Sequence, residues 1–478
     1  AATAENVTIT WDQTASGNRG IGRITQLVSQ SSTIRWVWDA LGRRTSEQVT
    51  LGTRNYTISY AYDADGNVSQ ITYPSGRQVA YARDAAGRIS GVTTRANASA
   101  SWVTLASNVF WRPFGPLQGL THGNGLTTWR TFTADGEIDV MLVEDGATDV
   151  IKRTLTRTDN LNITNIWDDV TPARNQSFWY DARNQLQNAS GPWGDLTYYY
   201  DLVGNRTYAI QTPAGGGATT THVLNFPATS NRISSVTVGT PTGTAVRTFT
   251  HDGAGNITQD VRTGSGTYNY TMNQRNRLAT ARVGTTQVGS YVYDALERLA
   301  IRTTSNVSPA GTTHFAYDLS GKVLVEANGA NGATVREYIW FDDMPLAIVA
   351  NVDTASPQLL HVHADHLDRP IILTNGSKAN VWEAVYRPFG EVHAITPGYT
   401  TLQGGPLWPL KSREAAMAAF RAAWDEGQHV EDWPPRGSSE WAQNRPVQWR
   451  GDDVPPGCGP WRPGEEPPRL RTGALPDE

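Results

Sequence analysis

The sequence lacks the features that mark several common classes of protein. Cys458 is the single cysteine in 478 residues, which excludes an internal disulfide framework and a multi-thiolate metal site. No run of 18 apolar residues occurs, so no transmembrane helix is predicted. The chain starts Ala1-Ala2-Thr3, with neither an initiator Met nor the basic and apolar start of a signal peptide. We therefore expect residue 1 to be a cut or processed end within a longer protein.

An excess of charge of one sign is also missing. The 40 Lys and Arg residues nearly balance 45 Asp and Glu residues, which gives a net charge of -5 and a pI of about 6.0. A chain of this balance is not expected to bind nucleic acid or an anionic membrane through broad electrostatic attraction. Aromatic residues are plentiful, with 17 Trp and 18 Tyr, whereas disordered chains are poor in them. An ordered fold is therefore expected.

The sequence contains a tandem repeat. In a typical copy an aromatic residue is followed directly by Asp, then three residues later by Gly or Asn, and next by Arg, Asn or Lys. From residue 181 to 318 most Asp or Asn positions are 20, 21, 21 and 24 residues apart, with one longer break between 201 and 252. Asp at the first position of a turn accepts a backbone hydrogen bond, and Gly or Asn three residues later tolerates the left-handed conformation. The residues assigned to repeat turns are Tyr62, Asp63, Gly66, Tyr200, Asp201, Gly204, Asp252, Gly255, Tyr293, Asp294, Tyr317, Asp318 and Gly321.

Between these turns the sequence alternates polar and apolar residues, as in Tyr56-Thr57-Ile58-Ser59-Tyr60, which is strand periodicity. A repeat of this length has room for two strands. One hairpin cannot bury its own face, whereas stacked hairpins can. The repeat therefore predicts an all-β fold built as one continuous array of hairpins over residues 1 to about 350.

These repeats resemble the YD repeats of the Rhs family, which also occur in teneurins and in the cocoon subunits of bacterial insecticidal toxin complexes. The run from 361 to 391 is similar to the segment that ends an Rhs core. Its family-motif residues are His363, Asp365, His366, Leu367, Pro370, Trp382, Tyr386, Pro388, Phe389 and Gly390. A weaker echo of the same motif is Trp111-Arg112-Pro113-Phe114-Gly115.

The resemblance implies a spiralling, hollow β-shell over residues 1–394 that encloses a C-terminal toxin or other effector used in intercellular competition. It implies a non-enzymatic, secreted or cell-surface protein without a cofactor. The family's N-terminal plug and secretion-spike segment, and the self-cleavage motif that follows its core, have no match in this sequence. The enclosed cargo and an N-terminal plug are therefore the expected partners.

Residues 395–478 differ in composition, since 13 of the 26 prolines lie between Pro397 and Pro476. One helix is predicted near 412–426, capped by Ser412 and ended by Gly427, and the remainder is expected to be irregular. This tail is interpreted as an effector, a degenerate remnant or a frameshifted segment, and the sequence does not separate the three.

The densest group of candidate metal ligands is His361, His363, Asp365, His366 and Asp368, with the first two histidines on one strand face. We favour a structural role for it, and a plain turn over calcium at residues 63–67, because the spacing of a calcium loop is absent. No catalytic motif accompanies the polar residues of the tail, which are His429, Glu431, Asp432, Asp452, Asp453 and Cys458. Two alternative functions stay open: an adhesion module that binds carbohydrate or a receptor, and a small effector enzyme in the tail.

Overall fold

The computed structural model describes residues 5–305 and 310–396. These residues form one 34-stranded sheet in which each strand pairs antiparallel with the next strand of the chain. The described part contains two short 3-10 helices, η1 (Ala15–Gly17) and η2 (Pro172–Arg174), and no α-helix. None of its helices is long and apolar enough to cross a membrane. The prediction of an all-β array of hairpins is confirmed.

The strands follow one another at short intervals along the chain. They are β1 (Thr8–Trp11), β2 (Ile24–Val28), β3 (Ser32–Trp38), β4 (Arg44–Leu51), β5 (Arg54–Tyr62), β6 (Val68–Thr72), β7 (Gln78–Arg83), β8 (Ile89–Arg95), β9 (Val103–Trp111), β10 (Leu117–His122), β11 (Thr127–Phe132), β12 (Ile138–Asp145), β13 (Thr148–Arg157), β14 (Ile163–Asp168), β15 (Gln176–Tyr180), β16 (Leu186–Gly191) and β17 (Gly194–Tyr200). The second half comprises β18 (Arg206–Thr212), β19 (Thr220–Asn225), β20 (Ser235–Val238), β21 (Ala245–His251), β22 (Ile257–Arg262), β23 (Gly266–Met272), β24 (Leu278–Val283), β25 (Thr286–Tyr293), β26 (Leu299–Thr304), β27 (Gly311–Tyr317), β28 (Val323–Asn328), β29 (Thr334–Phe341), β30 (Met344–Ala350), β31 (Gln358–Ala364), β32 (Pro370–Thr374), β33 (Asn380–Tyr386) and β34 (Val392–Thr396).

Each repeat forms a hairpin turn with one pattern of hydrogen bonds. At Asp294 the carboxylate accepts the backbone N–H groups of Leu296 and Arg298 through Oδ1, at 2.8 and 3.0 Å, and the Nε of Arg298 through Oδ2, at 2.8 Å. The fourth residue, Glu297, has a φ of 65°. Glycine adopts this left-handed conformation without a steric penalty, and it holds the position at Gly66, Gly204, Gly255 and Gly321. The carboxylate thus satisfies the N–H groups that the tight turn leaves without partners.

The aromatic residue before the Asp connects each turn to the preceding one. Tyr317 donates its hydroxyl to the carbonyl of Leu299, the first residue of the strand after the previous turn, at 2.5 Å. The Arg298 guanidinium lies over the Tyr317 ring, 4.9 Å from its centroid. The same hydroxyl bond joins Tyr62 to Arg44, Tyr180 to Ile163, Tyr200 to Leu186, Tyr293 to Leu278 and Tyr386 to Pro370. The Tyr, Asp and Arg of the repeat therefore act together to lock consecutive hairpins.

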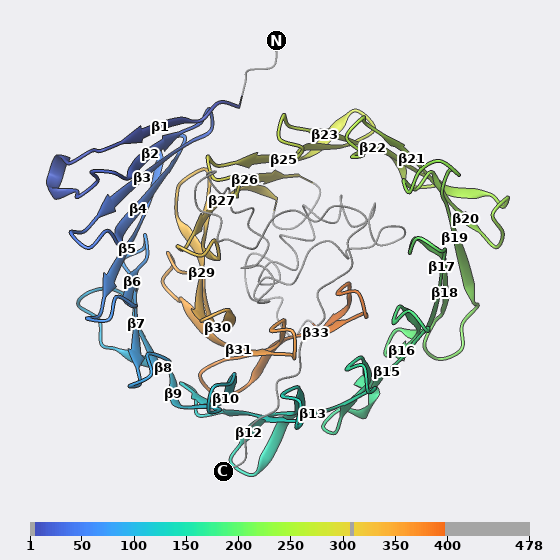
Figure 1. Ribbon diagram of the computed structural model, residues 1–478, viewed down its shortest axis with the longest axis horizontal. Coiled ribbons are helices and arrows are strands. Elements are labelled where there is room, and N and C mark those ends of the chain that lie inside the picture. The colour runs from blue at the N-terminus through green and yellow to red at the C-terminus, as the bar shows by residue number, and fades with distance from the viewer. Residues whose placement is uncertain (1–4, 306–309, 397–478) are drawn as a thin grey trace, which may run out of the picture. The chain divides into compact units, whose positions relative to one another are not determined.

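The sheet winds through more than one turn, so late strands pack against early ones (Figure 1). The hydroxyl of Ser31 donates to the carbonyl of Tyr293, 262 residues further along, at 2.8 Å. Later in the chain the Lys378 ammonium pairs with Asp145, at a separation of 233 residues. The second turn, β25 to β34, thus follows the first turn, β2 to β18, and in Figure 1 β29–β31 lie inside the arc of β4–β9. We call the contact between the two turns the seam.

The largest hydrophobic core lies in the seam. It joins Ile34, Ile58 and Val79 of the first turn to Ile339 and Leu346 of the second, all of them fully buried. Where the sheet has only one layer its side chains are more exposed to solvent, and every residue of β18 is half-buried. A single hairpin face is thus covered by the next turn of the same sheet, which is how a chain with only 38% hydrophobic residues builds a core.

Three further turns have the geometry of the repeat but lack the Asp that marks it in the sequence. They begin at Arg112, Thr133 and Thr158, each of which accepts the same backbone hydrogen bond that Asp294 accepts from Glu297. The hydroxyls of Thr133 and Thr158 also accept a backbone N–H, at 3.3 and 3.2 Å, where Asp does so elsewhere. These turns lie between the repeat turns assigned from the sequence at Asp63 and Asp201.

The chain divides into a unit from Ala1 to His429 and a unit from Val430 to Glu478. The predicted boundary at residue 394 lies two residues before the end of β34. The predicted helix near 412–426 and the polar residues of the tail lie outside the described residues, so these remain predictions.

Replacing the turn carboxylate tests its role in the fold. We expect Asp294→Ala to lower the free energy of unfolding by about 3 kcal/mol, because it leaves the half-buried Arg298 guanidinium with one carboxylate fewer and two N–H groups without their acceptor. Asp65→Ala, an exposed position in an equivalent turn, is the control and should change it by less than about 0.5 kcal/mol. Urea unfolding measures both, and equal effects would contradict the role of the carboxylate.

Candidate functional site

The segment from 361 to 391, which carries the family motif, forms part of the seam. It comprises most of β31, all of β32 and β33 and the two turns that follow β31 and β33. Asp365 heads the first of these turns: it accepts the N–H groups of Leu367 and Arg369, both at 2.9 Å, and the Nε of Arg369 at 2.8 Å. Arg369 lies over the ring of Tyr386, whose hydroxyl donates to the Pro370 carbonyl at 2.6 Å. Four residues of the motif are thus one further copy of the repeat unit.

The remaining motif residues shape the second turn and its contacts. Gly390 has a φ of 85° in a turn closed by Arg387 and Glu391. Phe389 is exposed, and its ring lies 5.3 Å from that of Tyr198 on β17. Trp382 is buried in the second hydrophobic core, Pro388 is half-buried, and Leu367 is exposed at a turn tip.

Burial and ion pairing compete at Asp365. Burial alone would raise the pKa of this carboxyl, but the charge of Arg369 and its hydrogen bonds hold the pKa below its ordinary value. In the exposed turn at Asp84, the hydrogen bond from Arg88 is the main cause of the lowered pKa. Both carboxylates are therefore ionised at neutral pH and available as hydrogen-bond acceptors.

The seam brings a third histidine to the two on β31. His122, at the end of β10, has its ring centroid 4.6 Å from that of His363 and 5.9 Å from that of His361. All three are at most 3% exposed. We call His122, His361 and His363 the histidine cluster. Burial lowers the pKa of His363 to about 3 and that of His361 to about 4, and it lowers the pKa of His122 well below its ordinary value.

The structure separates the other three candidate ligands from the histidine cluster. Asp365 is bound to Arg369, as described above. Asp368 accepts a hydrogen bond from Arg130 at 3.1 Å. His366 lines a pocket further along the seam, where burial lowers its pKa to about 4. Among the described residues, no group of three or more His, Cys, Asp or Glu is arranged to hold a metal ion.

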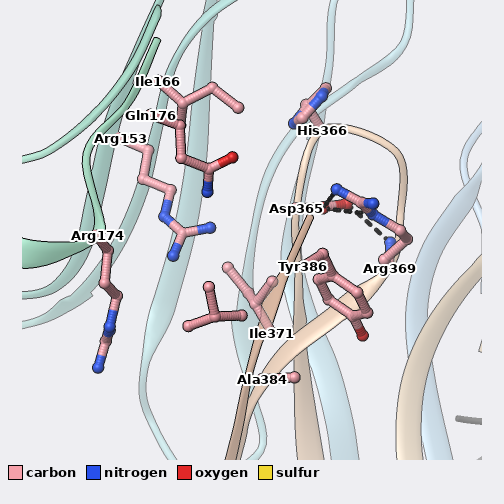
Figure 2. Close-up of a pocket in the computed structure, with 11 residues that line it drawn as sticks. Arg153, Ile166, Arg174, Gln176, Asp365, His366, Arg369, Ile371, Ala384 and Tyr386 are labelled. Atoms are coloured by element: carbon pink, nitrogen blue, oxygen red, sulfur yellow. Dashed lines mark hydrogen bonds and ion pairs between the residues drawn. The ribbon is translucent and has the colours of Figure 1, made fainter. Parts of the chain in front are cut away.

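The pocket at His366 is small and lies between the two turns of the sheet (Figure 2). Arg153 and Arg174 reach it from the first turn, while His366 and Arg369 reach it from the second. Arg153 is held by Asp168, with 3.0 Å between Nε and Oδ2. The pocket leaves about 20 Å³ for the centre of a water molecule, which is room for about one water.

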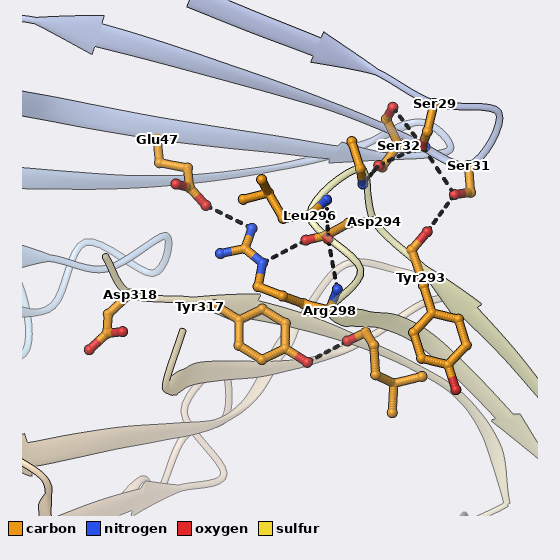
Figure 3. A network of polar contacts seen from close by, with 12 residues as sticks. Ser29, Ser31, Ser32, Glu47, Tyr293, Asp294, Leu296, Arg298, Tyr317 and Asp318 are labelled. Carbon is orange, nitrogen blue, oxygen red and sulfur yellow. Dashed lines mark hydrogen bonds and ion pairs between the residues drawn. The ribbon is translucent and has the colours of Figure 1, made fainter. Parts of the chain in front are cut away.

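Buried ion pairs align the two turns elsewhere along the seam. Glu47 on β4 is fully buried and accepts a hydrogen bond from Trp36 at 2.7 Å. It also accepts one from Arg298 of the second turn at 3.0 Å (Figure 3). In the same way the fully buried Glu337 pairs with Arg77 at 2.6 Å. Removing one member of such a pair leaves a buried charge uncompensated, so these pairs favour a single register of the two turns.

Taken together, the geometry is that of a spiral β-wall whose hairpins carry one repeated turn. Residues 62–99 match the family model described as RHS Repeat. This match assigns residues 62–99 to the RHS repeat and supports the resemblance of the repeated turns to those of the Rhs family.

Comparison with known proteins agrees with this assignment. Among solved structures, a mutant of the Photorhabdus luminescens Tc holotoxin pore matches 83% of this chain with a TM-score of 0.69 and 16% identity. The TcdB2–TccC3 crystal structure matches the same share with a TM-score of 0.69 and 15% identity. Among curated proteins, the double-stranded DNA deaminase toxin A of Burkholderia cenocepacia (strain H111) is 24% identical over 32% of this chain. The chain spans 22% of each toxin-complex chain and 14% of the deaminase toxin.

Gly123 tests how closely the turns must approach at the histidine cluster. A Cβ at this position would collide with the Thr104 carbonyl and lie 3.1 Å from Cε1 of His361. We expect Gly123→Ala to lower the free energy of unfolding by about 1–3 kcal/mol. Gly376→Ala, where a Cβ meets no atom within 4 Å, is the matched control in thermal or urea unfolding. Equal stability of the two variants would show that the close approach is not required.

Proposed function

We propose that this chain is part of a non-enzymatic Rhs-type shell that encloses a C-terminal toxin or effector and releases it in competition between cells. The observation that carries the proposal is the single sheet that winds back on itself, together with the similarity of its fold to a toxin-complex structure over 83% of the chain. A sheet of this kind separates an inner face from an outer face, which is what enclosure requires.

The position of the cargo is suggested by two related structures. TcdB2–TccC3 matches this chain with a TM-score of 0.69, and the same complex without its hypervariable C-terminal region matches with 0.67. The similarity therefore does not depend on that region. In this chain residues 397–478 follow the last described strand, and we propose that they are the enclosed segment or its remnant.

A mechanical rather than catalytic role for the shell is supported by the seam. Its pocket holds about one water, whereas small-molecule sites have volumes of several hundred Å³. The arginines and carboxylates beside it are paired with each other across the two turns or within one turn. A secreted location is proposed because the structures of similar fold belong to toxin complexes.

The single cysteine provides a direct test of enclosure. We expect Cys458 in the intact chain to react with a bulky polyethylene glycol maleimide at least about tenfold more slowly than in urea, because a shell excludes the reagent until it opens. The control places the single cysteine on an exposed turn, through Ala86→Cys in a Cys458→Ser background. After correction for the fraction of thiolate, this cysteine should react at the same rate in the folded chain and in urea. If Cys458 in the folded chain reacts as fast as the Ala86→Cys control, the shell does not enclose its own tail.

An adhesion module is the second candidate, because large aromatic side chains are exposed on the sheet. Trp11 and Trp179 are each 52% exposed, and Tyr199 is 47% exposed. Aromatic rings of this kind present flat apolar area to a ligand. Retention of the intact chain on a glycan array, lost in Trp179→Ala but kept in Trp382→Phe, would favour this function. No retention on any glycan would remove carbohydrate as the ligand and leave only a protein receptor.

A further inference from the structure

The histidine cluster is a place on the seam where three neutral imidazoles from both turns pack against one another, beside the ion pairs that also join the turns. His361 and His363 project from the same face of β31, since they are two residues apart on one strand. His122 meets them from β10 of the first turn. The three rings are packed edge to face, with interplanar angles of 66° and 80° for the two pairs that include His122.

The hydrogen bonds of the cluster suit only the neutral form. The Nε2 atoms of His122 and His363 lie 2.8 and 2.9 Å from the hydroxyls of Thr128 and Thr374. The Nδ1 atoms of all three rings are buried and have no hydrogen-bond partner among the described residues. A neutral ring can leave Nδ1 without a proton. A protonated ring carries an N–H on both nitrogens, so one donor would be buried without an acceptor.

Within residues 5–305 and 310–396, no carboxylate is placed to compensate a charge on these rings. Strands β9, β30 and β32, which flank the cluster, contain no charged residue. The charged groups at the seam on the other packed elements are already paired: Arg130 with Asp368, Lys378 with Asp145, Arg174 with Glu383 and Arg77 with Glu337. The charges that act on His122 are those of His361 and His363 themselves. A second proton in the cluster would therefore meet repulsion as well as burial.

We propose that the histidine cluster is an acid-sensitive latch: its protonation separates β31–β33 from β10–β13 and opens the seam. The latch is a property of the two packed turns, and it stands whether or not the sheet encloses a cargo. Gly123 and Asn124 support it, because the loop after β10 approaches β31 closely and Asn124 donates to Thr374 at 2.9 Å.

The direction of the pH dependence follows from the lowered pKa values. In the closed seam the pKa is about 3 for His363 and about 4 for His361, whereas an exposed histidine titrates near 6.5. The open state therefore binds more protons below pH 6.5. Closure is fully favoured above that pH and weakens as the pH falls, by about tenfold in the opening equilibrium per pH unit for each histidine. Most exposed carboxylates remain ionised down to about pH 5. Burial raises the pKa of the Asp318, Asp342 and Glu337 carboxyls in the closed seam, and a group that binds protons more tightly in the closed state favours closure as the pH falls. Opening between pH 7 and pH 5 is therefore attributable to the histidines.

Hydrogen exchange of the full chain, followed at each peptide between pH 7 and pH 5 and corrected for the intrinsic exchange rate, tests the latch. We expect protection in β31–β33 to fall steeply below pH 6.5, while β23 and β24, which contain no histidine, stay unchanged. The combined variant His122→Gln, His361→Gln and His363→Gln should show a shallower dependence on pH, to which the other seam histidines, His314 and His366 among them, still contribute.

Two further variants keep the test decisive if the triple variant does not fold. His363→Gln alone should reduce the steepness of the loss by about tenfold per pH unit. His222→Gln on β19, away from the seam, should leave the profile of β31–β33 unchanged. The latch is overturned if β31–β33 and β23–β24 lose protection in parallel, or if His363→Gln opens over the same pH range and with the same steepness as the unaltered chain.

Discussion

The aspartate carboxylate at the head of each turn is the contact on which the rest of the sheet depends. It accepts two backbone N–H groups that a tight turn leaves unpaired, and in copies such as Asp294 it also holds the arginine that ends the turn. That arginine lies over the tyrosine of the next repeat, and the tyrosine hydroxyl returns to the strand that follows the first turn. Each hairpin is thereby locked to its neighbour, so a chain of hairpins that are individually too small to fold becomes one sheet.

The winding of the sheet then supplies the burial that its hairpins lack. Residues about 260 apart meet across the seam, where apolar side chains form the main core and Glu47 and Glu337 are paired with arginines. Apolar contacts tolerate small slips between layers, whereas a buried carboxylate displaced from its arginine is costly. The ion pairs therefore select one alignment of the two turns, and the histidine cluster lies among them as a group of neutral rings that forms no ion pair of its own.

This arrangement connects the proposed enclosure with a way of ending it. A wall that closes by packing one turn on another can open along the seam without breaking any strand pairing within a turn. Loss of the contacts at β31–β33 would release the inner turn while the turn-to-turn locks of the first turn persist. The contacts of the seam therefore determine both the stability of the closed sheet and the proposed release of its cargo.

Much of this architecture was predictable from the sequence, because its signals are local. The turn residues, the strand alternation and the shared strand face of His361 and His363 all depend on neighbours within about five residues, whose geometry backbone chemistry dictates. The turns at Thr133 and Thr158 escaped because a hydroxyl there replaces the carboxylate. Only the tertiary structure decided that His122 packs against His361 and His363. It also decided that Asp368 binds Arg130 and that Glu337 pairs with Arg77. These partners are more than 200 residues apart, and their meeting depends on the accumulated curvature of the whole sheet, which no local pattern encodes.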